Sequence, residues 1–165
     1  MEIQRTQRSD LPVLLGIFAD ARRFMAENGN PNQWGDRFPT REMLEADIAA
    51  GHSYVCLDGG QIAATFYFST EGEPTYRVIR EGEWLDDTPY GVVHRIAAAK
   101  QGQGAAAYCL EWCLAQCGNI RIDTHRDNKP MQRLLTRLGY TYCGLIDLEN
   151  GRGERLAFQK RLEKA

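Results

Sequence analysis

The stretch Val92–Gln116, VVHRIAAAKQGQGAAAYCLEWCLAQ, decides the fold. It begins with the apolar, β-branched residues of a strand and ends in the spacing of an amphipathic helix. Between them lies the turn Gln101–Gly104, whose two glycines let backbone N–H groups face a ligand without obstruction by a Cβ atom. The start of the helix directs its unpaired N–H groups and its positive dipole end to the same place. The stretch therefore predicts an anion site, suited to a phosphate or pyrophosphate.

Length and composition limit the class of protein. The chain has 165 residues, enough for one domain with a hydrophobic core and too few for two, so we predict a single domain over residues 1–165. The net charge of −2, with acidic and basic residues interspersed, argues against binding to nucleic acid. No apolar run is long enough to span a membrane, and no signal peptide is recognisable. We therefore expect a cytoplasmic protein that binds neither nucleic acid nor membrane.

Three of the five cysteines, Cys109, Cys113 and Cys117, repeat every four residues and share one face of the predicted helix. Zinc sites usually combine closely spaced cysteines with a second pair elsewhere, and the sequence has no second pair. We therefore expect no metal and interpret the cysteines as small side chains packed against the sheet, reduced as in other cytosolic proteins.

The rest of the chain alternates between helical and strand periodicity. A polar, acidic insertion at residues 71–89 precedes the central strand, and turn signals near the end favour a final antiparallel pair. The predicted strands cover residues 2–7, 52–58, 61–69, 90–98, 119–123, 140–146 and 155–160. The predicted helices cover residues 11–27, 40–50, 105–116 and 129–138.

Two classes of phosphate ligand compete for the glycine turn. Gly102-x-Gly104-x-x-Ala107 matches the dinucleotide-binding fingerprint, and Asp123 ends the next strand, as in an NAD-binding oxidoreductase. That fingerprint should open a series of βαβ units, but the segment after it is short and ends like an antiparallel hairpin. The competing interpretation is a single strand–turn–helix unit that holds the pyrophosphate of coenzyme A.

The turn sequence Gln101–Ala106, QGQGAA, fits the signature Q/R-x-x-G-x-G/A, and here the chain resembles the GNAT superfamily of acyl-CoA-dependent N-acetyltransferases. Asn128, the helix after it and Leu138-Gly139-Tyr140 resemble the second motif of that superfamily. HRIA at residues 94–97 and DTHRDNKPMQ at residues 123–132 resemble one uncharacterised bacterial branch. The resemblance covers nearly the whole chain. It implies an α/β (α+β) fold with a mixed, mostly antiparallel central sheet of about seven strands and about four helices.

The resemblance also implies an activity, which is transfer of the acetyl group of acetyl-CoA to a primary amine of a small molecule or peptide. The amine attacks the thioester directly, and no metal takes part. The cofactor-binding residues implied by the matching motifs are Ile96, Ala97, Ala98, Gln101, Gly102, Gln103, Gly104, Ala105, Ala106 and Asn128.

His94 is the predicted general base, because it lies on the central strand beside the expected acetyl group and histidine titrates near neutral pH. In a regular strand His94 and Ile96 share one face and Arg95 takes the other, so a packed His94 could instead have a structural role. His125, at the end of the next strand, is an alternative base or a loop residue that orients Asn128. We also predict an ion pair between Arg95 and Asp123 on adjacent strands.

The general acid is harder to assign. The family often carries a tyrosine on the helix after Asn128, and the matching position here is Leu135. Tyr140 and Tyr142 are therefore the candidate acids. The missing tyrosine also motivates a second hypothesis, a non-catalytic acyl-CoA-binding module of the same fold.

The substrate site is predicted from the loop at residues 28–39 and from the insertion. An aromatic residue among amides in a loop can line a ligand pocket or anchor the loop. Acidic residues of the insertion favour a cationic amine. The candidate substrate-binding residues are Asn30, Gln33, Trp34, Trp84, Tyr90 and His125. The sequence leaves the oligomeric state open, with a homodimer as one option.

Overall fold

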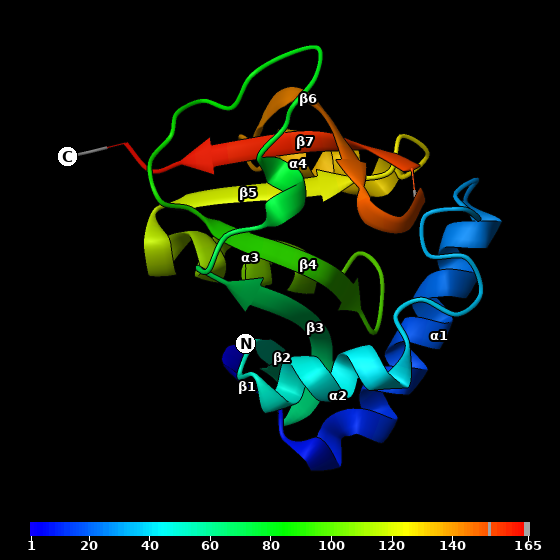
Figure 1. The fold of residues 1–165 in the computed structure, drawn as a ribbon. Coiled ribbons are helices and arrows are strands. Elements are labelled where there is room, and N and C mark those ends of the chain that lie inside the picture. The colour runs from blue at the N-terminus through cyan, green and yellow to red at the C-terminus, as the bar shows by residue number, and fades with distance from the viewer. Residues whose placement is uncertain (152, 164–165) are drawn as a thin grey trace.

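Seven strands form one open sheet in the order β1-β2-β3-β4-β5-β7-β6 (Figure 1). The computed structural model describes residues 1–151 and 153–163. Neighbouring strands are antiparallel except β4 and β5, which are parallel. The strands are β1 (Glu2–Arg5), β2 (Ser53–Asp58), β3 (Gln61–Ser69), β4 (Gly91–Ala98), β5 (Asn119–Thr124), β6 (Thr141–Leu148) and β7 (Gly153–Arg161). The predicted mixed, mostly antiparallel sheet is confirmed, and the single parallel pair does not continue as the βαβ series of a dinucleotide-binding fold.

Helices cover both faces of the sheet. The four α-helices are α1 (Leu11–Glu27), α2 (Arg41–Ala49), α3 (Ala105–Cys117) and α4 (Lys129–Arg137). Short 3-10 helices are η1 (Arg8–Asp10), η2 (Pro74–Tyr76) and η3 (Glu149–Gly151). Helices α1 and α2 pack on one face, and α3 and α4 on the other (Figure 1). Among the described residues, no helix combines the length and the apolar character that crossing a membrane requires.

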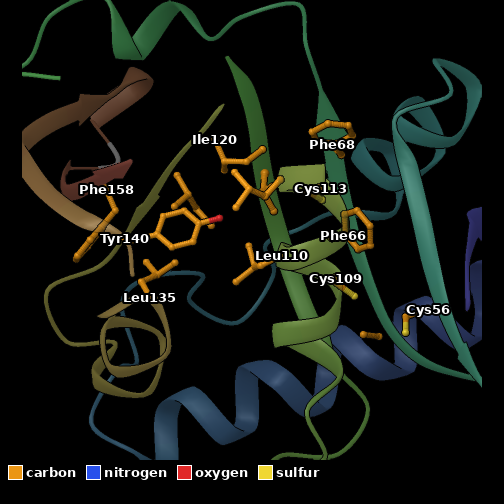
Figure 2. Packing of buried hydrophobic residues seen from close by; sticks show 14 of the residues in the cluster. Cys56, Phe66, Phe68, Cys109, Leu110, Cys113, Ile120, Leu135, Tyr140 and Phe158 are labelled. Carbon is orange, nitrogen blue, oxygen red and sulfur yellow. The ribbon is translucent and has the colours of Figure 1, made fainter. Parts of the chain in front are cut away.

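The core on the α3 face contains the helix cysteines. Figure 2 shows Cys109, Leu110 and Cys113 of α3 directed at the strands, and all three are buried. Burial raises the pKa of the Cys109 and Cys113 thiols, which keeps them neutral. Their predicted packing role is confirmed, while Cys117 lies half-buried at the helix end.

The parallel strands β4 and β5 stay paired over a short length only. Gly91 is paired with Ile120 and Val92 with Arg121. Beyond these two pairs β4 continues to Ala98 and β5 to Thr124, but the described residues include no further pairing between the two strands. The sheet is therefore open at its centre, on the side where α3 and α4 begin.

The predicted insertion at residues 71–89 is held against β6. Arg80 and Leu145 exchange two backbone hydrogen bonds of 2.8 and 2.9 Å. Gly82 lies so close to β6 that a Cβ atom on it would be 1.9 Å from the carbonyl oxygen of Cys143. The insertion is therefore a fixed part of the scaffold, and its first part, η2, reaches the open centre of the sheet.

Two glycine substitutions test this packing. Gly82→Ala should lower the free energy of unfolding by about 1–3 kcal/mol, because the new methyl group overlaps the backbone of β6. Gly16→Ala should raise it by about 0.5–1 kcal/mol, because Gly16 is an exposed α1 residue with no atom within 4 Å of the added Cβ. Urea denaturation measures both. Equal stability of the two variants would contradict the close contact between the insertion and β6.

Candidate functional site

A cavity of about 370 Å³ occupies the opening between β4 and β5. Its walls come from both strands, from α1 and α2 with the loop between them, from the first turns of α3 and α4, and from the segment between β6 and β7. The predicted site residues that line it are Asn30, Gln33, Trp34, His94, Ile96, Ala97, Ala98, Gln101, Ala106 and Asn128. The fold thus brings together parts of the predicted catalytic, cofactor and substrate sets.

A β-bulge shapes the wall formed by β4. Tyr67 of β3 is paired with His94 and Thr65 with Ala97, so β4 has one residue more than β3 between these pairs. Arg95 takes up the extra length in the left-handed region, at φ 51°. The bulge therefore breaks the regular alternation of side chains in the middle of the central strand.

The prediction that His94 and Ile96 share a face is wrong because of this bulge. His94 and Arg95 both point to the α1–α2 side, where their partners are Glu73 and Asp47. Ile96 instead packs against the core on the α3 side. A regular strand would have turned Arg95 away from His94, but the bulge places both on the cavity wall.

His94 is paired with a carboxylate that sequence reasoning missed. Its Nε2 atom lies 2.7 Å from Oε1 of Glu73, and each side chain is 21% exposed. The other Glu73 oxygen accepts a hydrogen bond of 3.2 Å from the backbone N–H of Thr75 at the start of η2. The hydrogen bond with His94 holds the pKa of Glu73 below its ordinary value, despite the opposing effect of burial. The sequence signal was only a helix-capping residue before Pro74.

A second buried pair lies across the opening. The Tyr76 hydroxyl donates a hydrogen bond of 2.6 Å to Oδ2 of Asp123, which lines the cavity. Burial, together with the neighbouring negative charges, raises the pKa of Tyr76.

The predicted ion pair between Arg95 and Asp123 is wrong: Nη2 of Arg95 lies 2.7 Å from Oδ2 of Asp47 on α2. The bulge turns Arg95 toward α2 and leaves Asp123 to Tyr76.

Three amide side chains join the loop between α1 and α2 to the start of α4. Oε1 of Gln33 accepts hydrogen bonds from Nδ2 of Asn30 at 2.8 Å and from Nδ2 of Asn128 at 2.9 Å. Asn128 also caps α4, since its Oδ1 atom accepts from the Met131 N–H. Asn30 is 3% exposed, and among the described residues its Oδ1 atom has no hydrogen-bond partner. This buried oxygen is available to a donor in the cavity.

The turn before α3 has the chemistry of a pyrophosphate site. Gly102 and Gly104 adopt φ values of 75° and 80°, and no atom lies within 4 Å of a Cβ atom built on either. No side chain among the described residues caps the helix that starts at Ala105. The first-turn N–H groups of α3 therefore face open space, next to the cavity wall that contains Gln101 and Ala106. These residues fit the pyrophosphate of coenzyme A.

The two candidate acids do not line the cavity. Tyr140 is 7% exposed in the core beneath α3, and its hydroxyl has no hydrogen-bond partner in the described part of the chain (Figure 2). Burial raises the pKa of Tyr140. Tyr142 is half-exposed on β6 and packs edge-on against Phe158, 5.7 Å away between ring centroids. Leu135, at the position of the family tyrosine, is completely buried.

Three predicted substrate residues also lie outside the cavity wall. Trp84 and Tyr90 enclose the guanidinium of Arg121, which is 4.4 and 4.1 Å from their ring centroids. Nδ1 of His125 accepts a hydrogen bond from the Asp127 N–H, and burial lowers the pKa of His125. These three side chains were predicted to bind substrate, and in the structure they contact other groups of the protein instead.

Comparisons with known proteins agree with this geometry. The family model of the acetyltransferase (GNAT) family matches residues 19–140. A GNAT-family acetyltransferase from Streptococcus agalactiae is 34% identical, with a TM-score of 0.90 over 99% of this chain and 96% of the other. The protein yncA from Salmonella typhimurium, solved with its cofactor acetyl-CoA, is 17% identical, with a TM-score of 0.63 over 99% and 95%. Ribosomal-protein-alanine N-acetyltransferase from Brucella melitensis is 18% identical, with a TM-score of 0.65 over 98% and 100%. A search of curated proteins finds no significant match.

The His94–Glu73 pair predicts a pH dependence of stability. The folded protein lowers the pKa of Glu73 below its ordinary value of 4.5. At any pH above 4.5 the charged Glu73 side chain therefore makes its full contribution to the free energy of unfolding. That contribution is lost as the pH falls through the lower folded pKa. The difference in unfolding free energy between the wild type and Glu73→Gln should therefore be largest near neutral pH and shrink below pH 4.5, in urea titrations across this range. A difference that stays constant with pH would contradict the stabilising role of the charge.

Proposed function

This chain belongs to the GNAT family of acetyltransferases, and we propose that it transfers the acetyl group of acetyl-CoA to a primary amine of a small molecule or peptide. The observation that carries the proposal is the His94–Glu73 pair, which lies at the bulge of β4 and faces the cavity. A histidine oriented by a carboxylate is a common arrangement for a general base.

Bound acetyl-CoA would supply the thioester that the amine attacks. The glycine turn and the start of α3 would bind its pyrophosphate through backbone N–H groups. Beyond Val92 the edge of β4 that faces β5 has no strand partner within residues 1–151 and 153–163, so its backbone groups can pair with an extended amide-containing arm, as an added strand would. Asn128, which lines the cavity at the opposite wall, would contact the same arm.

His94 would take the proton from the amine as its nitrogen bonds to the acetyl carbon and the carbon–sulfur bond breaks. Glu73 would fix the orientation of the imidazole ring and stabilise its charged form. A backbone N–H beside the bulge, at Ile96 or Ala97, would donate to the thioester oxygen as it gains charge. The electron pair of the broken bond leaves on sulfur, which takes a proton from His94 or from solvent.

One observation favours a second candidate function. Leu135 replaces the tyrosine acid of many relatives, and no tyrosine lines the cavity among the described residues. The same pyrophosphate and β4 surfaces would serve a non-catalytic acyl-CoA-binding module equally well. Both functions predict that acetyl-CoA binds, and only the acetyltransferase predicts that an amine is acetylated.

Calorimetry with acetyl-CoA and thiol release with a panel of amines test the proposal. His94→Ala should lower kcat by about 100-fold or more, the usual contribution of a general base, while acetyl-CoA still binds. The matched control is His52→Ala. His52 also lies near a glutamate, with Nε2 3.5 Å from Oε2 of Glu71, but is outside the cavity, so this variant should keep full activity.

Each alternative has its own result. Binding without turnover for any amine would support the non-catalytic module. No binding at millimolar acetyl-CoA would refute the family function in this chain, and full turnover by His94→Ala would remove His94 as the base.

A further inference from the structure

We propose that the cavity selects amines that carry an apolar group, such as alkyl or arylalkyl monoamines, over diamines and free amino acids. The inference rests on the proposed acetyl transfer at the same site. It concerns the part of the cavity next to α1 and α2, where the acceptor would lie.

The first observation is a group of large apolar side chains on one side of the cavity. The side chains that form it come from α1, the loop after it and α2, and all line the cavity while remaining only half-buried. They are Phe24, Met25, Trp34, Phe38 and Met43. Large apolar side chains in a cavity keep surface exposed to water, and an apolar group of a ligand gains free energy by covering it. We call these five residues the apolar wall.

The wall is held in place by contacts within the protein. The Trp34 ring meets the buried Phe18 ring edge-on, with centroids 5.6 Å apart, and lies 6.4 Å from the Phe38 ring. The Phe38 N–H donates to the Trp34 carbonyl oxygen at 3.2 Å, and Nη1 of Arg22 donates to the Phe38 carbonyl oxygen at 3.3 Å. A preformed wall loses little conformational entropy when a ligand binds.

The second observation places the apolar wall beside the reacting centre. Arg95 of the bulge is joined to Asp47 of α2, with Nη2 2.7 Å from Oδ2. Met43 lies one helical turn before Asp47 and so occupies the same face of α2. Because Arg95 follows His94 in the bulge, an amine next to His94 would extend its substituent toward Met43.

The third observation is the distribution of charge. The Glu73 carboxylate lies 2.7 Å from His94, where the amino group of the acceptor would be, and the Asp123 carboxylate lines the same cavity on β5. Arg95 is neutralised by Asp47, and no member of the apolar wall carries charge. The other charged side chains of the cavity are Glu149 of η3 and Arg155 of β7, and the Arg155 guanidinium donates a hydrogen bond of 3.1 Å to the Gln33 carbonyl oxygen. A second ammonium or a carboxylate held against the apolar wall would lose water without an opposite charge within the wall itself, which is unfavourable.

Two matched pairs of amines test the inference in the acetyl-CoA assay. Hexylamine and 1,5-diaminopentane have equal chain length and differ by a terminal ammonium group. 2-Phenylethylamine and phenylalanine differ by a carboxylate. The apolar member of each pair should have kcat/KM higher by about tenfold or more, the range expected for discrimination in an apolar pocket.

The possible failures are distinct. Equal or faster acetylation of 1,5-diaminopentane or phenylalanine would overturn the inference and leave the proposed function intact. Acetylation of a peptide amine in preference to all four would also overturn the inference. If none of the four were acetylated while another amine was, the inference would be overturned and the proposed function kept. If acetyl-CoA binds and no amine at all is acetylated, the proposed function would fail and the inference with it.

A substitution in the wall tests its role directly. Met43→Glu places a carboxylate there, so kcat/KM should fall about tenfold for hexylamine and rise for 1,5-diaminopentane. Val13→Glu is the matched control, because Val13 is 49% exposed on α1 and lies outside the cavity. Val13→Glu should leave kcat/KM unchanged for both hexylamine and 1,5-diaminopentane. If Met43→Glu does not fold, Met43→Gln should still lower the value for hexylamine. Unchanged selectivity in a folded Met43 variant would overturn the inference.

Discussion

The two backbone pairings between β4 and β5, Gly91 with Ile120 and Val92 with Arg121, are the constraint on which the rest of the structure depends. They hold the two halves of the sheet together at one end and let the strands separate at the other. A fully paired sheet would have filled its centre with side chains packed to crystal-like density and left no internal opening. Here the opening forms a cavity, and both α3 and α4 begin at its margin. The cavity therefore originates in the architecture of the sheet.

The bulge at Arg95 determines which β4 side chains line this opening. A non-glycine residue in the left-handed region is unfavourable and is kept only where its surroundings compensate. Two contacts compensate for it. Arg95 forms an ion pair with Asp47 in which the two side chains are 13% and 15% exposed, and its guanidinium packs over the Tyr67 ring. The result is a strand that presents His94 to the cavity and fixes α2 beside it. One local irregularity thus connects His94, the apolar wall and the helix layer.

The sequence predicted the elements well, and it placed the glycine turn and the helix cap correctly, because these depend on local patterns. Glycines in the turn before α3 and the cap at Asn128 are read from neighbouring residues, and both lie where expected. Pairings between distant residues were predicted poorly. Glu73 and His94 are 21 positions apart, and nothing in either local pattern indicates their contact. Tyrosines near the second motif were attractive as acids, but the sheet places Tyr140 in the core and Tyr142 on the outer strand.

The order of strands and helices, the family and the position of the glycine turn could all be read from the sequence, since periodicity, caps and glycine conformation are local properties. Only the tertiary structure decided which side chains face the cavity. A single extra residue in β4 reverses the alternation that a sequence pattern assumes, so Arg95 meets Asp47 and leaves Asp123 to Tyr76. Such a bulge arises from the fit between β3 and β4 across the sheet, which depends on residues far apart in the chain.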